Sequence, residues 1–104
     1  MTTPEIAIDT LIHVVQGTNN STVLRAAAVE GLGIAGGEEA LGVLLKILEG
    51  TNNPVHLRIS AAAALGNVGG SEARKSLIKI LAGANNAVDL RSAAARALGN
   101  AVRR

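Results

Sequence analysis

The side chains that could perform catalysis or bind a metal are few and scattered. The two histidines, His13 and His56, have no cluster of acidic residues beside them, and the chain contains no cysteine. A metal site needs three or four convergent ligands. The serines also lack a neighbouring His and acid that could activate a nucleophile. The sequence therefore predicts a protein that is not an enzyme, with no catalytic residues, no metal site and no cofactor.

Two glycine pairs are followed by acidic residues and raise the question of phosphate binding. Gly36-Gly37 precedes Glu38 and Glu39, and Gly69-Gly70 precedes a serine and another glutamate. Phosphate sites use free amides at a helix N-terminus, and a glutamate in that first turn repels phosphate. Adjacent helical residues also point in different directions, so the two glutamates do not form a glycosidase-like carboxylate pair. We interpret the glycine pairs as tight corners between helices.

Basic side chains concentrate in the last third of the chain. Residues 71–104 carry seven basic and two acidic side chains, whereas residues 1–70 carry three basic and six acidic ones. Arg91, Arg96, Arg103 and Arg104 could neutralise a few phosphates. No Phe, Tyr or Trp is available to stack on bases, so nucleic-acid binding is kept only as a less favoured alternative. The opposite charges of the two parts would also favour head-to-tail contact or an acidic partner.

The arginines belong to a pattern that repeats every 33 residues. Three kinds of residue recur at this spacing: arginine at Arg25, Arg58 and Arg91, glycine at Gly17, Gly50 and Gly83, and Asn-Asn pairs ending at Asn20, Asn53 and Asn86. A fixed period of this length indicates a stack of similar units, each burying a face against the next. We predict one domain over residues 1–104, with units at about 4–36, 37–69 and 70–104.

Each unit is predicted to contain two helices. Leu41, Leu44, Leu45 and Leu48 follow the i, i+3, i+4, i+7 spacing of a helix with one apolar face. The predicted first helices span 4–16, 38–49 and 71–82, and the second helices span 21–35, 54–68 and 87–103. No alternating pattern indicates a strand. The expected fold is therefore all-α.

The residues between the two helices of a unit have predicted capping roles. Gly17, Gly50 and Gly83 follow the last apolar residue of each first helix, where a glycine can form a left-handed C-cap. Asn20, Asn53 and Asn86 then stand where an N-cap is needed for the second helix. Thr3, which precedes Pro4, is expected to cap the first helix.

Three segments of the sequence carry a family resemblance: VLRAAAVEGLGIAGGEEAL, HLRISAAAALGNVGGSEA and DLRSAAARALGN. They resemble the HEAT-like repeat, in the form associated with phycobilin lyase-type proteins. The resemblance implies an α-solenoid of three 33-residue helical hairpins, a HEAT/armadillo-like superhelix. It also implies that Arg25, Arg58 and Arg91 form a structural ladder between successive units, with the turn asparagines beside them. The second helices would line the inner face of the superhelix.

The sequence favours a non-catalytic protein–protein interaction or scaffold module with an unidentified protein partner. On the second helices the positions that vary between units are the expected contact residues, in one row Ala26, Ile59 and Ser92, and in the next Glu30, Ala63 and Arg96. An accessory part of a bilin lyase-type enzyme is the alternative that the resemblance suggests. No apolar run of membrane-spanning length or signal peptide is evident, so we expect no membrane association and a cytoplasmic location.

The two ends of the stack differ in polarity. The first helix is apolar on most sides, and Ile6 stands where the later units have Glu39 and Glu72. We expect Ile6, Ile8 and Ile12 to form a contact surface, through which the chain could form a homo-oligomer. The last helix carries polar residues that we expect to form its outer face and close the stack: Asp89, Ser92, Arg96, Asn100, Arg103 and Arg104.

Overall fold

Six α-helices and no strands make up the chain in a computed structural model that describes residues 1–104. The helices are α1 (Pro4–Gln16), α2 (Thr22–Ala35), α3 (Glu38–Glu49), α4 (Val55–Val68), α5 (Gly70–Ala82) and α6 (Val88–Val102). Each bound lies within one residue of the predicted one, and the all-α fold class is confirmed. None of these helices combines the length and hydropathy that crossing a membrane requires.

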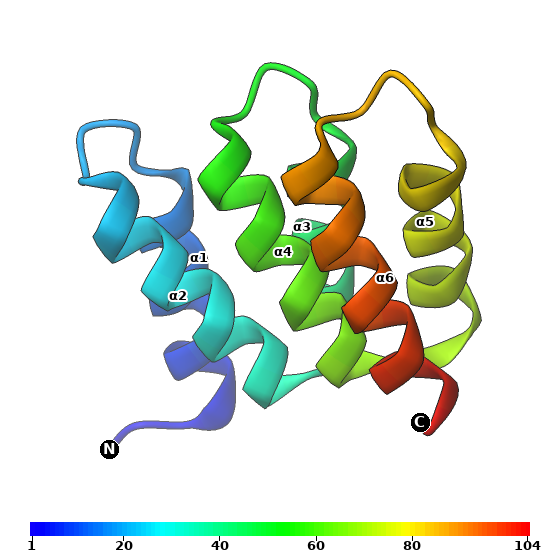
Figure 1. Cartoon of the computed structure of the whole chain (residues 1–104). Coiled ribbons are helices and arrows are strands. Elements are labelled where there is room, and N and C mark those ends of the chain that lie inside the picture. Colours follow the sequence, from blue (N-terminus) through cyan, green and yellow to red (C-terminus); the bar gives the residue numbers. More distant parts are fainter.

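The helices form two layers, with α2, α4 and α6 in one layer and α1, α3 and α5 behind it (Figure 1). Within the first layer, neighbouring helices pack directly on one another, whereas α1, α3 and α5 have few contacts with each other. The second helices therefore form the more closely packed layer, and we call its solvent-exposed side the inner face. The two ends of the chain lie at opposite ends of the stack (Figure 1).

The core consists of leucine, isoleucine, valine and alanine side chains. Apolar residues at helical spacing on α3 and α5 face the second helices, where small alanines allow close approach. Helix α4 has a neighbour on each side in its layer, and its apolar residues are therefore buried around most of its circumference. The largest fully buried side chains are Val29, Leu32, Leu44, Leu48, Leu57, Leu65, Leu77 and Leu90.

The corners between hairpins depend on the two glycine pairs. Gly36 and Gly37 have φ values of 70° and 89°, and Gly69 and Gly70 have values of 71° and 85°. Side chains disfavour this left-handed region, which glycine adopts freely. The predicted role of these pairs as helix-ending corners is therefore confirmed. At the N-terminus, Thr3 Oγ1 accepts a hydrogen bond from the Ile6 amide at 3.2 Å, as predicted for the cap of α1.

Candidate functional site

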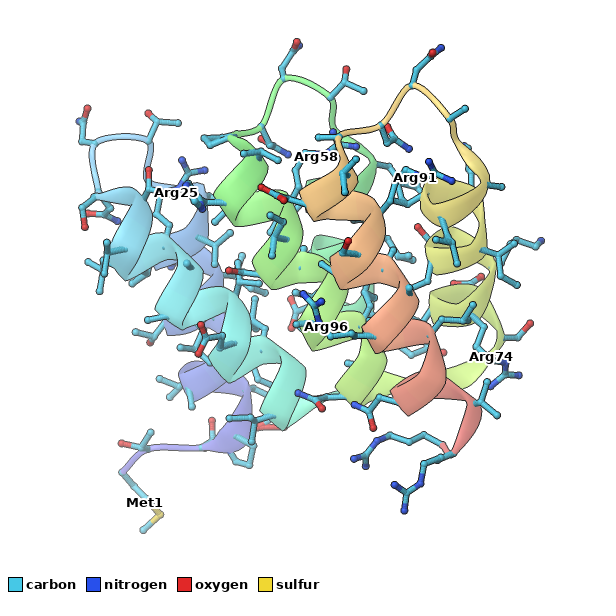
Figure 2. All side chains as sticks on the ribbon, viewed as in Figure 1. Met1, Arg25, Arg58, Arg74, Arg91 and Arg96 are labelled. Carbon is cyan, nitrogen blue, oxygen red and sulfur yellow. The ribbon has the colours of Figure 1, made fainter.

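The three repeated arginines hydrogen-bond within their own hairpins. Arg25 Nε donates to the Val15 carbonyl oxygen at 2.8 Å, and Arg58 and Arg91 make the same bond ten residues back, each at 2.9 Å. These bonds run from a second helix to the end of its own first helix, where carbonyl groups lack helical partners. They do not join successive hairpins, as the resemblance implied. Figure 2 shows the three arginines in a row along the edge of the stack that carries the turns within the hairpins.

The repeated asparagines cap the first helices instead of the second helices. Asn20 Nδ2 donates to the Val14 carbonyl oxygen at 3.0 Å, and Asn53 and Asn86 donate in the same way to carbonyls six residues earlier. The predicted N-cap role is wrong, because the N-cap positions fall one residue later. At the N-cap of α2, the Ser21 hydroxyl accepts a hydrogen bond from the Leu24 amide. The N-caps of α4 and α6 make no side-chain hydrogen bond.

The repeated glycines make room for these asparagines. Gly17, Gly50 and Gly83 have φ values between −75° and −79°, so the predicted left-handed C-cap is also wrong. A Cβ atom on any of the three would lie 2.6 Å from the Nδ2 atom of the asparagine three residues later. Only glycine therefore allows the amide to reach the end of the first helix. The repeated turn residues are thus engaged in holding each hairpin together.

The two variable rows lie on the inner layer. Ala26, Ile59 and Ser92 are half-buried, and the members of the other row, Glu30, Ala63 and Arg96, are exposed. Ile59, Ala63 and Arg96 come together around a hollow of about 270 Å³ between α4 and α6. Figure 2 shows the Arg96 side chain on the inner layer, beside α4. Ala26 and Glu30 lie apart from this hollow on α2.

Two asparagines that the sequence did not indicate as contact residues complete this hollow. Asn100 Nδ2 donates to Asn67 Oδ1 at 2.9 Å, and both side chains line the hollow. They are 33 residues apart and belong to a third variable row with Ile34. The polar change from Ile34 to asparagine in the next two units was the signal in the sequence that could have identified them.

A larger hollow of about 390 Å³ lies between the outer helices α1 and α3. It is lined by acidic, basic and apolar side chains, among them Arg25, Glu38, Glu39, Lys46 and Ile47. No buried side-chain nitrogen or oxygen atom in the protein lacks a hydrogen-bond partner. This hollow therefore contains no buried, unsatisfied side-chain group that would indicate a ligand.

Of the three isoleucines expected to form a contact surface on α1, only Ile6 is well exposed. Ile6 is 52% exposed, whereas Ile8 and Ile12 are partly buried and pack against the core. Apart from Met1, which precedes α1, the other large exposed apolar side chains at this end are on α2: Val23, Leu24 and Ile34. The apolar surface at the N-terminal end therefore belongs mainly to α2.

Two of the polar residues that the sequence placed on the outer face of the last helix lie elsewhere. Arg96 and Asn100 line the hollow between α4 and α6, so they face the preceding hairpin and the inner layer. The end of the stack instead exposes Ala95, Gly99 and Val102. The reason is the helical register, because these three residues follow the i, i+4, i+7 spacing of a single face.

The remaining candidate groups do not converge. Arg91 and Arg103 are twelve residues apart on or next to α6, a rise of about 18 Å along a helix. The basic side chains that suggested nucleic-acid binding are therefore spread along the length of α6. His13 and His56 are exposed on α1 and α4, and no three His, Asp or Glu side chains gather in a group.

Comparison with known protein families gives one match. The family model for HEAT repeats matches residues 8–99, which is most of the chain. No curated protein matches the sequence significantly. The match covers all three hairpins and agrees with the observed two-layer stack of helices.

Proposed function

From the premise that this chain belongs to the HEAT repeat family, we propose that it is a non-catalytic module that binds a protein segment on its inner face. HEAT repeats generally mediate protein–protein interaction. The observation that supports this surface is the hollow between α4 and α6, where Ile59, Ala63 and Arg96 meet. Solenoids commonly use such inner faces as extended recognition surfaces.

The chemistry of the hollow supports one kind of partner. Ile59 and Ala63 provide an apolar wall that suits a small apolar side chain, and the exposed Arg96 offers a guanidinium group to a carboxylate. Asn67 and Asn100 add hydrogen-bonding atoms at the same place. We therefore expect a peptide segment that has an acidic residue close to an apolar one.

Selection of peptides from a random displayed library would test this proposal. Peptides enriched on the wild-type protein are then measured against Ala63→Glu by fluorescence anisotropy. We expect binding to weaken about tenfold or more, which corresponds to about 1.4 kcal/mol or more. The matched control is Ala84→Glu in the exposed turn between α5 and α6. If the enriched peptides bind Ala63→Glu as tightly as wild type, the inner face is not the binding surface.

The two alternative functions have less support. An accessory role in a bilin lyase rests on the resemblance alone, and a change in bilin absorbance on mixing would favour it. Nucleic-acid binding would require the arginines of α6 to act together, but Arg91 donates to Leu81 at one end and Arg103 lies at the other. Salt-dependent retardation of DNA or RNA would favour that alternative.

A further inference from the structure

The two junctions between successive second helices use the same contact. A Cβ atom on Gly33 would lie 2.8 Å from the Cα atom of Ala64, and one on Gly66 would lie 2.9 Å from the Cα atom of Ala97. These distances leave no room for a side chain, so each glycine allows two helix backbones to approach closely. Each internal junction therefore joins a glycine-bearing face to an alanine-bearing face.

The C-terminal end of the stack has a glycine-bearing face with nothing packed on it. Gly99 is equivalent to Gly66, but no atom lies within 4 Å of the position that its Cβ would take. Ala95, one turn earlier, is exposed although its equivalent Ala62 is fully buried, and Val102 is 67% exposed. A glycine in the middle of a helix is unfavourable for the helix itself. We call this surface the tail face; it consists of Ala95, Gly99 and Val102 on α6 and Ile78 on α5.

The N-terminal end has the opposite face of the junction, most of which is exposed. Its central residue, Gly31, is half-buried beside the Leu11 side chain and takes the place of Ala64 and Ala97. Leu24 is 49% exposed, whereas its equivalents Leu57 and Leu90 are at most 1% exposed. Ala27 and Ala35 are exposed on α2, although the residues at these positions on α6 are buried. We call this surface the head face; it consists of Leu24, Ala27, Gly31 and Ala35 on α2 and Ile6 on α1.

The outer layer shows the same complementarity. Leu45 and Glu72 line one hollow between α3 and α5, on opposite sides of an internal junction. The residue equivalent to Leu45 at the tail is Ile78, and the residue equivalent to Glu72 at the head is Ile6. These two isoleucines are 53% and 52% exposed. A junction between the two ends would bring them together and replace a leucine–glutamate neighbourhood with an apolar pair.

Charge favours contact between unlike ends. The first hairpin, residues 1–36, has one basic and three acidic side chains. The last hairpin, residues 70–104, has seven basic and two acidic ones. Opposite charges accelerate the approach of a head to a tail, and like charges oppose head-to-head and tail-to-tail encounters.

We infer that a second copy of this chain stacks end to end on the first, with its head face on the tail face. Such a heterologous contact leaves one head and one tail free, so further copies can add unless the rotation closes a ring. Gly99 would then pack against Gly31, which is equivalent to Ala64 and Ala97 at the internal junctions. The sequence predicted self-association through the first helix, but the geometry assigns most of the contact to α2. This inference is independent of the proposed peptide binding on the inner face.

Light scattering coupled to gel filtration, over a series of protein concentrations, tests for the assembly. We expect the wild-type mass to rise with concentration, and we expect Gly99→Gln to remain a monomer because its side chain fills the tail face. Gly42→Gln is the matched control, since Gly42 is also an exposed helical glycine with open space around its Cβ position but lies at neither end. A wild-type protein that stays monomeric, or a Gly99→Gln variant that assembles like Gly42→Gln, would overturn the inference.

A mixing experiment tests the orientation of the contact. Gly99→Gln has an intact head face, and Ala27→Gln has an intact tail face. We expect each variant alone to be a monomer and the equimolar mixture to form a dimer that does not grow further. Assembly of Gly99→Gln by itself would show a head-to-head contact, and a mixture that stays monomeric would show that these faces do not join.

Discussion

Helix α4 at the centre of the inner layer and α2 and α6 at its ends have similar sequences but different surroundings. Leu57 on α4 is fully buried, while the equivalent Leu24 on α2 is half exposed. Gly66 on α4 is in contact with Ala97, while the equivalent Gly99 on α6 faces open space. The same residue type is therefore a core residue in one hairpin and a surface residue in the next. Burial in this protein depends on the neighbouring hairpin and not on the residue type alone.

The turns within the hairpins are the opposite case, because their surroundings are the same in each unit. Each has a glycine, an asparagine three residues later and an arginine whose Nε donates to the first helix. These contacts lie within a hairpin, so they do not require a neighbour. We therefore expect substitutions in the turns to have similar effects in all three hairpins, and substitutions at the junctions to have different effects at the centre and at the ends.

The largest difference between centre and end is expected for the leucine row. Leu57→Ala removes a fully buried side chain and should destabilise the protein by about 2–5 kcal/mol. Leu24→Ala removes a half-exposed one and should cost less than about 1 kcal/mol. Urea unfolding of both variants, at a concentration where the protein is monomeric, measures the difference. Equal losses would contradict the assignment of Leu24 to an open end.

The second comparison is between a turn arginine and an inner-face arginine. Arg58 is 9% exposed and donates to the Leu48 carbonyl, so Arg58→Ala should cost about 1.5–3 kcal/mol. Arg96 is exposed, so Arg96→Ala should change stability by no more than about 0.5 kcal/mol. Arg96→Ala should nevertheless weaken binding of acidic peptides selected on the inner face. A stable Arg58→Ala variant would show that the repeated arginine does not hold the hairpin together.

A smaller effect is expected within the Asn-Asn pair of the second turn. Asn53→Ala removes the hydrogen bond to the Ile47 carbonyl and should cost about 1 kcal/mol. Asn52→Ala changes the exposed neighbour in the same turn and should cost no more than about 0.5 kcal/mol. Thermal unfolding of the two variants provides the measurement. If Asn52→Ala is less stable than Asn53→Ala, the first asparagine of the pair is the capping residue and this assignment is wrong.

The period and the apolar spacing were sufficient to predict the helices and the fold class. The direction of the asparagine side chain was not predictable, because an amide between two helices can serve the carbonyls of the first or the amides of the second. The structure shows that the glycine three residues earlier makes space for the amide to reach the carbonyls of the first helix. The relevant signal was therefore the Gly17–Asn20 spacing rather than either residue alone.

The polar last helix shows a second limit of sequence reasoning. Arg96 and Asn100 are polar, but their positions on α6 face α4 and the inner layer. Counting polar residues along a helix does not identify which of its faces is free. The alignment of Gly99 with Gly66 carried that information, because residues that share a repeat position share a face. The placement of the two variable rows on the inner layer could be predicted for the same reason, since these residues were chosen by row.

The most direct test of the contrast between centre and end is whether two glycine-to-alanine substitutions change the stability of the monomer in opposite directions. Gly66→Ala would place a Cβ atom 2.8 Å from the Ala97 carbonyl oxygen, and we expect it to destabilise the monomer by about 1–3 kcal/mol. Gly99→Ala meets no atom within 4 Å and improves the helix, so it should stabilise the monomer by about 0.5–1 kcal/mol. Urea unfolding at low protein concentration gives both values. Opposite signs would support an occupied junction at Gly66 and an open one at Gly99, and a loss of stability in both variants would contradict it.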